Sequence, residues 1–182
     1  MKKFIAIVAL SLTPFISFAS NVVVGEHLPQ ISIADKGEVM IEQGEFTYRN
    51  WSSDELKGRV MVVQHLAGRT SAKELNDPLM EVIAAANFSP EVYTTTTIVN
   101  TDDAIWGTSG LVNSSLKDNK EEFPTAIFVI DASGDTRSQL DLEEESSAIF
   151  LIDKEGTVLF AKDGALTKDE ITTVMGMINA QL

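Results

Sequence analysis

The chain contains no cysteine among its 182 residues. A protein without cysteine forms no disulfide, and it has no thiolate that acts as a nucleophile or binds a metal. Thiol–disulfide exchange and thiol peroxidase chemistry both require a thiolate, so both activities are excluded. A domain of this size buries enough apolar surface to fold without a disulfide.

Basic residues are also scarce. The sequence has 14 Lys and Arg residues against 27 Asp and Glu residues, which gives a net charge of −13. So acidic a chain has no basic patch that neutralises phosphates, which argues against nucleic acid as a partner. Electrostatic repulsion from the acidic chain also argues against binding to an anionic membrane surface. The sequence has no internal repeat and no low-complexity linker.

A long apolar stretch occurs only at the N-terminus. The basic residues Lys2 and Lys3 precede an apolar stretch at 4–18, and small residues at Ser17 and Ala19 suit a cleavage site. This pattern predicts a signal peptide at 1–19, cleaved after Ala19. A membrane anchor is the alternative, but the stretch is shorter than the ~20 residues of a spanning helix. Residues 20–182 then form one domain without a further membrane span.

Strand and helix patterns alternate along the mature chain. Two capping boxes, Ser71–Glu74 and Thr167–Glu170, predict helix starts, and a third at Ser52–Glu55 predicts a short helical turn. Pro78 predicts a kink or a restart in the first long helix. Asp35–Glu38 has the composition of a turn. The predicted strands lie at 30–33, 45–49, 60–63, 93–100, 125–130, 148–152 and 157–161, and the predicted helices at 71–86, 108–118 and 167–178.

This order predicts an α/β fold. Strands that alternate with helices need crossover connections, which build a central mixed sheet with helices on both faces. The final hairpin and helix are typical of a small three-layer fold.

Three features together resemble the thioredoxin-like superfamily. They are the order of the elements, the segment Gly25-x-x-Leu28-Pro29 and the strand and loop at 59–74. The resemblance is to the exported branch that carries an extra N-terminal β-hairpin. Three segments (65–74, 145–149 and 162–166) are similar to the YtfJ family, a group of proteobacterial periplasmic proteins of undetermined function. The resemblance implies a thioredoxin-like domain over 20–182 and a periplasmic location.

The chain departs from the superfamily where redox chemistry occurs. The segment that usually carries the reactive cysteine is Arg69–Lys73, which reads Arg-Thr-Ser-Ala-Lys. The usual cis-proline corresponds to Ser147, and a cis bond before a non-proline residue is costly, so we expect a trans bond. The resemblance therefore implies a binding or adaptor module without redox activity. Its expected contact residues are His65, Gly68, Arg69, Thr70, Ser71, Lys73, Ser146 and Ser147.

Two interpretations of the loop before the first long helix remain open. A helix N-terminus attracts anions, and Arg69, Lys73 and the Thr70 and Ser71 hydroxyls would add donors. Alternatively, Ser71 and Glu74 cap each other while Arg69 pairs with a carboxylate. The expected partner is a protein or a small anionic ligand of the cell envelope. No cofactor and no metal are implied.

His65 offers an alternative function. It lies at the carboxyl end of the inner strand, just after 60–63, where α/β folds place ligands. The alternative hypothesis is therefore a hydrolase in which His65 acts with Thr70 or Ser71, if a hydroxyl lies within hydrogen-bond reach. The sequence has no G-x-S-x-G motif to support this hypothesis. The competing interpretation is a partly buried structural histidine. His27 has no partner at metal-ligand spacing and is expected at the surface.

Two further features have a structural and a functional interpretation. The acidic segment from Asp131 has oxygen ligands at alternating positions, but an EF-hand loop needs Gly and Glu where Thr136 and Leu142 stand, so a turn plus an acidic segment is expected. Trp51 is expected in the core. Trp106 lies in a loop, where an exposed aromatic side chain is typical of an interface.

Overall fold

A computed structural model describes residues 20–182, and the predicted signal peptide at 1–19 lies outside the described residues. The strands are β1 (Ser32–Glu42), β2 (Glu45–Ser52), β3 (Val60–Ala67), β4 (Tyr93–Asn100), β5 (Ile127–Asp131), β6 (Ser147–Ile152) and β7 (Val158–Asp163). The helices are α1 (Thr70–Ala86), α2 (Ser109–Glu122), α3 (Asp135–Leu140) and α4 (Lys168–Gln181), with a 3₁₀ turn, η1, at Ser53–Glu55.

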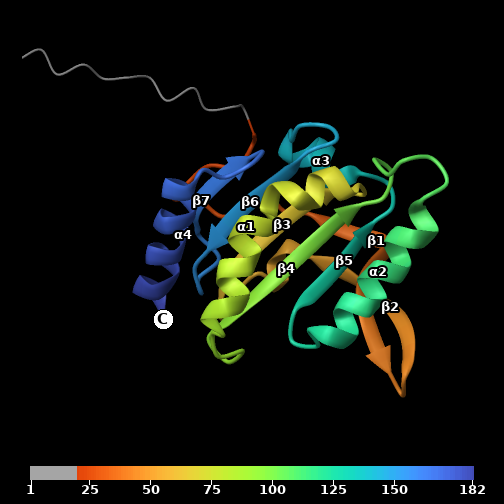
Figure 1. The fold of residues 1–182 in the computed structure, drawn as a ribbon, viewed down its shortest axis with the longest axis horizontal. Helices are drawn as coiled ribbons and strands as arrows, with labels where there is room; N and C mark the ends of the chain where they lie inside the picture. Colours follow the sequence, from red (N-terminus) through yellow and green to blue (C-terminus); the bar gives the residue numbers. More distant parts are fainter. Residues whose placement is uncertain (1–19) are drawn as a thin grey trace, which may run out of the picture.

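All seven strands form one mixed sheet in the order β2-β1-β5-β4-β3-β6-β7 (Figure 1). Strands β3, β4 and β5 are parallel, whereas β6 runs antiparallel to β3. The carboxyl ends of the three parallel strands therefore lie at one edge of the sheet, together with the beginning of β6. The loops at this edge contain most of the predicted contact residues.

Both faces of the sheet are covered, which confirms the predicted three-layer α/β fold. On one face, α1 and α4 contribute Leu79, Ile83, Val174 and Ile178 to a core with strand residues, and α2 contributes Leu116 to a neighbouring cluster. Figure 1 shows these three helices side by side over the sheet. The opposite face packs against α3, η1 and the N-terminal segment. Its core includes Val22, Ile31, Leu56, Leu140 and Leu142.

The N-terminal hairpin exists, but its turn is not where the composition predicts it. Strand β1 continues through Asp35–Glu38, where the pairing with β2 is irregular, and the hairpin turn lies at Gln43 and Gly44. Gly37 has a φ of 78°, and a Cβ atom there would lie 2.2 Å from the carbonyl oxygen of Arg49. A bulge needs such a glycine, so turn-forming residues here mark a bulge within a strand.

The predicted helix starts agree in part with the structure. The capping box at Thr167 is present, and the Ser52 N–H donates to the carboxylate of Glu55. The prediction of a capping box at Ser71 is wrong. Helix α1 begins at Thr70, its N-cap is Arg69, and no side chain caps it. A single helix also runs through Pro78, so the helix does not restart there. Among residues 20–182, no helix has the length and apolar character needed to cross a bilayer.

Candidate functional site

Two predicted contact segments lie side by side at the carboxyl edge of the sheet. The N–H of Gly68 donates to the carbonyl of Asn100 (2.8 Å), and the N–H of Ala67 donates to the carbonyl of Ser146 (3.0 Å). The loop after β3 therefore contacts both the loop after β4 and the turn before β6. The structure brings together the 68–73 and 146–147 segments, as the resemblance implies.

Gly68 allows the close approach of these loops. A Cβ atom at this position would lie 2.9 Å from Cβ of Ala104 and 3.0 Å from the carbonyl oxygen of Asn100. Both distances are shorter than ordinary van der Waals contact, so a larger residue would push the loop after β4 away. Gly68 acts in the packing of the site and offers no group to a ligand.

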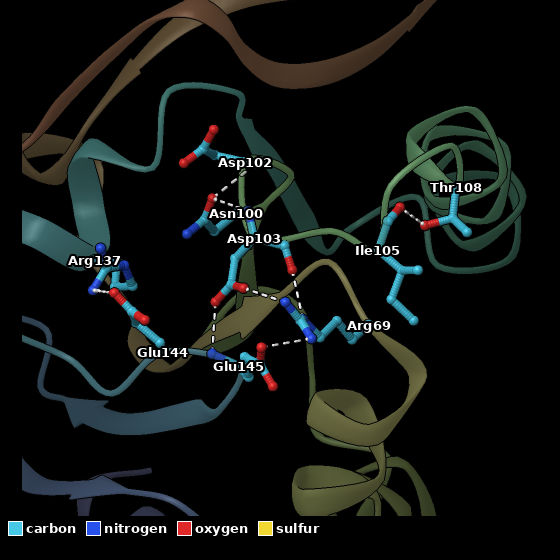
Figure 2. A network of polar contacts seen from close by, with 9 residues as sticks. All are labelled: Arg69, Asn100, Asp102, Asp103, Ile105, Thr108, Arg137, Glu144 and Glu145. Atoms are coloured by element: carbon cyan, nitrogen blue, oxygen red, sulfur yellow. Dashed lines mark hydrogen bonds and ion pairs between the residues drawn. The ribbon is translucent and has the colours of Figure 1, made fainter.

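Arg69 connects the three loops through its guanidinium group (Figure 2). Its Nε donates to the carbonyl of Asp103 and its Nη2 to Oδ1 of the same residue, both at 2.8 Å. Its Nη1 lies 3.0 Å from Oε1 of Glu145. The Glu145 N–H donates to Oδ2 of Asp103 at 2.6 Å, which closes the network. Two carboxylates therefore neutralise Arg69, as the structural interpretation of this residue predicts.

Hydrogen bonds within its own loop also fix the position of Asp103. Oδ1 of Asn100 accepts hydrogen bonds from the N–H groups of Asp102 (3.0 Å) and Asp103 (3.3 Å), so the end of β4 turns sharply. The side chains of Arg69 and Asp103 are only 21% and 13% exposed. Water screens this pair less than a surface pair, so we expect removal of one partner to cost more than it does in a surface pair.

The remaining polar residues of the loop face solvent. Thr70 and Ser71 are exposed at the first turn of α1, and Lys73 pairs with Asp77 at 3.3 Å on the helix surface. The side chain of Lys73 is still 62% exposed. The accessible part of the predicted contact set consists of these three residues and the half-buried Ser146. Glu145 is exposed beside Ser146 but is not among the predicted contact residues.

Ser147 lies inside the protein and links β6 to α1. Its hydroxyl donates to Oδ1 of Asn76 (3.0 Å), whose Nδ2 donates to Oε1 of Gln64 (3.3 Å). Nε2 of Gln64 in turn donates to the hydroxyl of Thr97 at 2.8 Å. All four side chains are buried. No cis peptide bond occurs within residues 20–182, so the predicted trans bond before Ser147 is confirmed.

His65 is a core residue of the opposite face of the sheet. It is 2% exposed, and its Nε2 has no hydrogen-bond partner. The pKa of His65 is lowered to about 4, mainly by burial; Asp131 and Asp103 oppose this shift, and Arg137 adds to it. Among the hydrogen bonds of residues 20–182, none joins His65 to Thr70 or Ser71. The geometry that the hydrolase hypothesis requires is therefore not present.

Asp131 caps a helix that the sequence patterns do not predict. Its Oδ1 accepts from the N–H groups of Gly134 (2.9 Å) and Asp135 (3.3 Å), and its Oδ2 accepts from that of Thr136 (2.8 Å). Part of the expected turn and acidic segment is thus the six-residue helix α3. Because backbone amides occupy the Asp131 carboxylate, it serves as a cap, and the structure gives no reason to assign calcium here.

The two tryptophans differ in exposure as expected. Trp51 is 2% exposed and belongs to the core, whereas Trp106 is 97% exposed in the loop after β4.

The sheet order, α1 after the central strand and the loop before β6 define a thioredoxin-like domain. The fold is similar to a thiol-disulfide isomerase from Corynebacterium glutamicum, with a TM-score of 0.56, 16% identity, and coverage of 85% of this chain and 97% of that one. It is also similar to the thioredoxin domain of a thiol-disulfide oxidoreductase from Bacteroides vulgatus, with a TM-score of 0.53, 18% identity, and coverage of 87% and 100%. At such identities the likeness concerns the fold alone.

The chain belongs to the family described as "Bacterial protein of unknown function (YtfJ_HI0045)", whose model matches residues 22–181. It is 44% identical over 182 residues to "Uncharacterized protein YtfJ" of Escherichia coli strain K12, covering 100% of this chain and 98% of the relative. An uncharacterized protein of Haemophilus influenzae is 38% identical over 178 residues, covering 98% and 97%. The predicted resemblance is thereby confirmed.

Proposed function

We propose that this protein is a periplasmic binding or adaptor module without redox activity. The observation that carries the proposal is the network of Arg69, Asp103 and Glu145. It occupies the region where the superfamily has its reactive cysteine, and it ties three loops into one rigid surface. A fixed surface loses little conformational entropy on association, which favours binding.

The proposed contact surface consists of Thr70, Ser71, Lys73, Glu145 and Ser146, which we call the loop surface. All five are exposed or half-buried and belong to two segments joined by a backbone hydrogen bond. Of the other predicted contact residues, Gly68, Arg69 and Ser147 support this surface from within, and His65 does not contribute to it.

A protein is a better partner for the loop surface than a small anion. The anion hypothesis needs the guanidinium of Arg69, but two carboxylates already neutralise that group. Lys73 is the only cation left on the loop surface, and it is paired with Asp77. A single paired lysine gives a small anion weak attraction in water.

The periplasmic location is supported by the signal-peptide pattern at 1–19 and by the family resemblance. An exported chain without cysteine also forms no incorrect disulfide in that oxidising compartment. The partner is therefore proposed to be a protein of the cell envelope.

The proposal is tested by immobilising residues 20–182 and capturing proteins from a periplasmic extract. Ser71→Tyr places a bulky, uncharged side chain on the loop surface, and Ser89→Tyr is its matched control, because both serines are exposed. Ser89 precedes β4, at the opposite end of the sheet. The proposal predicts a captured protein that Ser71→Tyr releases and Ser89→Tyr retains. Equal capture by both variants would contradict it.

A further inference from the structure

The loop after β4 and the first turn of α2 place apolar side chains in water close to the loop surface. Trp106 is 97% exposed, Ile105 56% and Leu111 73%. Large side chains are seldom exposed so completely and so close together in sequence. We call these three residues the tryptophan patch. Its loop is continuous with the loop surface, because Asp103 binds Arg69 and Gly68 packs closely on Ala104.

The tryptophan patch is presented by an ordered turn. The Thr108 N–H and hydroxyl donate to the carbonyl of Ile105 at 2.9 Å and 2.7 Å, and Gly107 has a φ of 84°. Figure 2 shows this turn leading from Asp103, which Arg69 holds by two hydrogen bonds, toward α2. Trp106 is therefore exposed on a turn fixed at both ends, which lowers the entropic cost of burying it against a partner.

The surroundings of the patch are acidic. Asp102 and Asp103 precede it on the same loop, and Glu144 and Glu145 lie on the adjacent turn (Figure 2). Glu143 begins that turn, where its N–H donates to Asp163. The two nearby guanidinium groups are already paired, Arg69 with Asp103 and Glu145, and Arg137 with Glu144. Asp102 and Glu143 are exposed, and no ion pair within residues 20–182 involves them.

The charge of the chain indicates which partner fits. A second copy would bring an equally acidic surface and a further charge of −13, so self-association through this face is opposed by repulsion. A partner with lysine or arginine beside apolar side chains complements both the negative charge around the patch and its exposed apolar surface. The face of an exposed indole also attracts cationic side chains directly.

We propose that the tryptophan patch and the neighbouring carboxylates bind a basic, apolar segment of a partner protein, with Trp106 as the anchor. This inference rests on the proposed function, because it names the chemistry of the partner that the loop surface binds. Trp106 is buried against the apolar side chains of the segment, and Asp102 and Glu143 face its cations. Burial of an anchor aromatic residue supplies much of the affinity of such contacts, and the carboxylates select the charge of the segment.

The test uses residues 20–182 and a short synthetic peptide in which lysine and leucine alternate. Affinity is measured by calorimetry, and Trp106 emission reports burial because Trp51 is already 2% exposed. Trp106→Ser is compared with Phe123→Ser, which removes a 46% exposed aromatic residue from the opposite end of α2. The double variant Asp102→Asn/Glu143→Gln is compared with Glu121→Gln/Glu122→Gln, which removes the same charge elsewhere on the surface.

We expect Trp106→Ser to weaken peptide binding by about tenfold or more and Phe123→Ser to leave it unchanged. The Asp102/Glu143 variant should bind more weakly than its charge-matched control, with a difference that shrinks at about 0.5 M salt. Trp106 emission should shift to shorter wavelength on binding. The inference would be overturned if the peptide does not bind or if the Trp106 emission does not shift. It would also be overturned if a variant and its matched control lose the same affinity.

A separate comparison distinguishes this inference from the proposed function. If the protein captured from periplasmic extract is released by Ser71→Tyr but retained by Trp106→Ser, the loop surface binds a partner and the tryptophan patch does not. If neither variant releases it, both proposals are wrong.

Discussion

His65 makes the stability of this protein depend on pH. Burial lowers its pKa from 6.5 to about 4, so the folded state binds fewer protons than the unfolded state between these values. Its contribution to the free energy of unfolding is present above about pH 6.5 and is lost as the pH falls toward 4. The whole shift corresponds to about 3 kcal/mol, of which about 2 kcal/mol is already lost at pH 5.

Carboxylates titrate over the same range, so the measurement needs a variant that lacks only the imidazole. His65→Met keeps a neutral side chain of similar size, and His27→Gln removes the exposed histidine as a control. The free energy of unfolding is measured in urea near pH 7.5 and near pH 5. The change between the two pH values should be about 2 kcal/mol smaller in His65→Met than in the wild type, and unaltered in His27→Gln. An equal change in all three proteins would refute the reasoning.

Three further predictions concern the site and the N-terminus. Arg69→Ala leaves the carboxylate of Asp103, which is 13% exposed, without its counter-ion. We expect the free energy of unfolding, measured in urea, to fall by about 1–3 kcal/mol. An unchanged value would show that the network contributes nothing to stability. Ser147→Ala removes the hydroxyl that donates to Asn76 and should cost about 1–2 kcal/mol by the same measurement, with a smaller effect from Ser146→Ala if the buried linkage is responsible. Protein isolated from the periplasm should have Ser20 as its first residue by intact mass, and a mass that includes residues 1–19 would contradict export with cleavage.

The sequence predicted the sheet well, because apolar runs such as Val60–Val63 are strong local signals of buried strands. Elements fixed by distant contacts were missed. Helix α3 has six residues and depends on the cap supplied by Asp131, so it leaves no periodic pattern. The bulge at Gly37 has the composition of a turn, because bulges and turns both need a glycine with positive φ.

The site was predictable only in outline. The resemblance located the loop at Arg69 and the turn at Ser147, and the structure places them side by side. Their partners were not predictable, because Asp103 is 34 positions from Arg69 and Asn76 is 71 positions from Ser147. A serine followed by a glutamate three positions later also gave a false capping box at Ser71, since α1 begins one residue earlier. Local patterns do not encode such contacts.

The central claim is that the loop surface binds a protein of the cell envelope. The most direct measurement places a photo-crosslinking amino acid at Ser71, with Glu155 as the control position at the opposite end of the sheet. Living cells are irradiated and the adducts are identified by mass. The account predicts an adduct with one defined protein from position 71 and none from position 155. No adduct from position 71, or the same adducts from both positions, would contradict it.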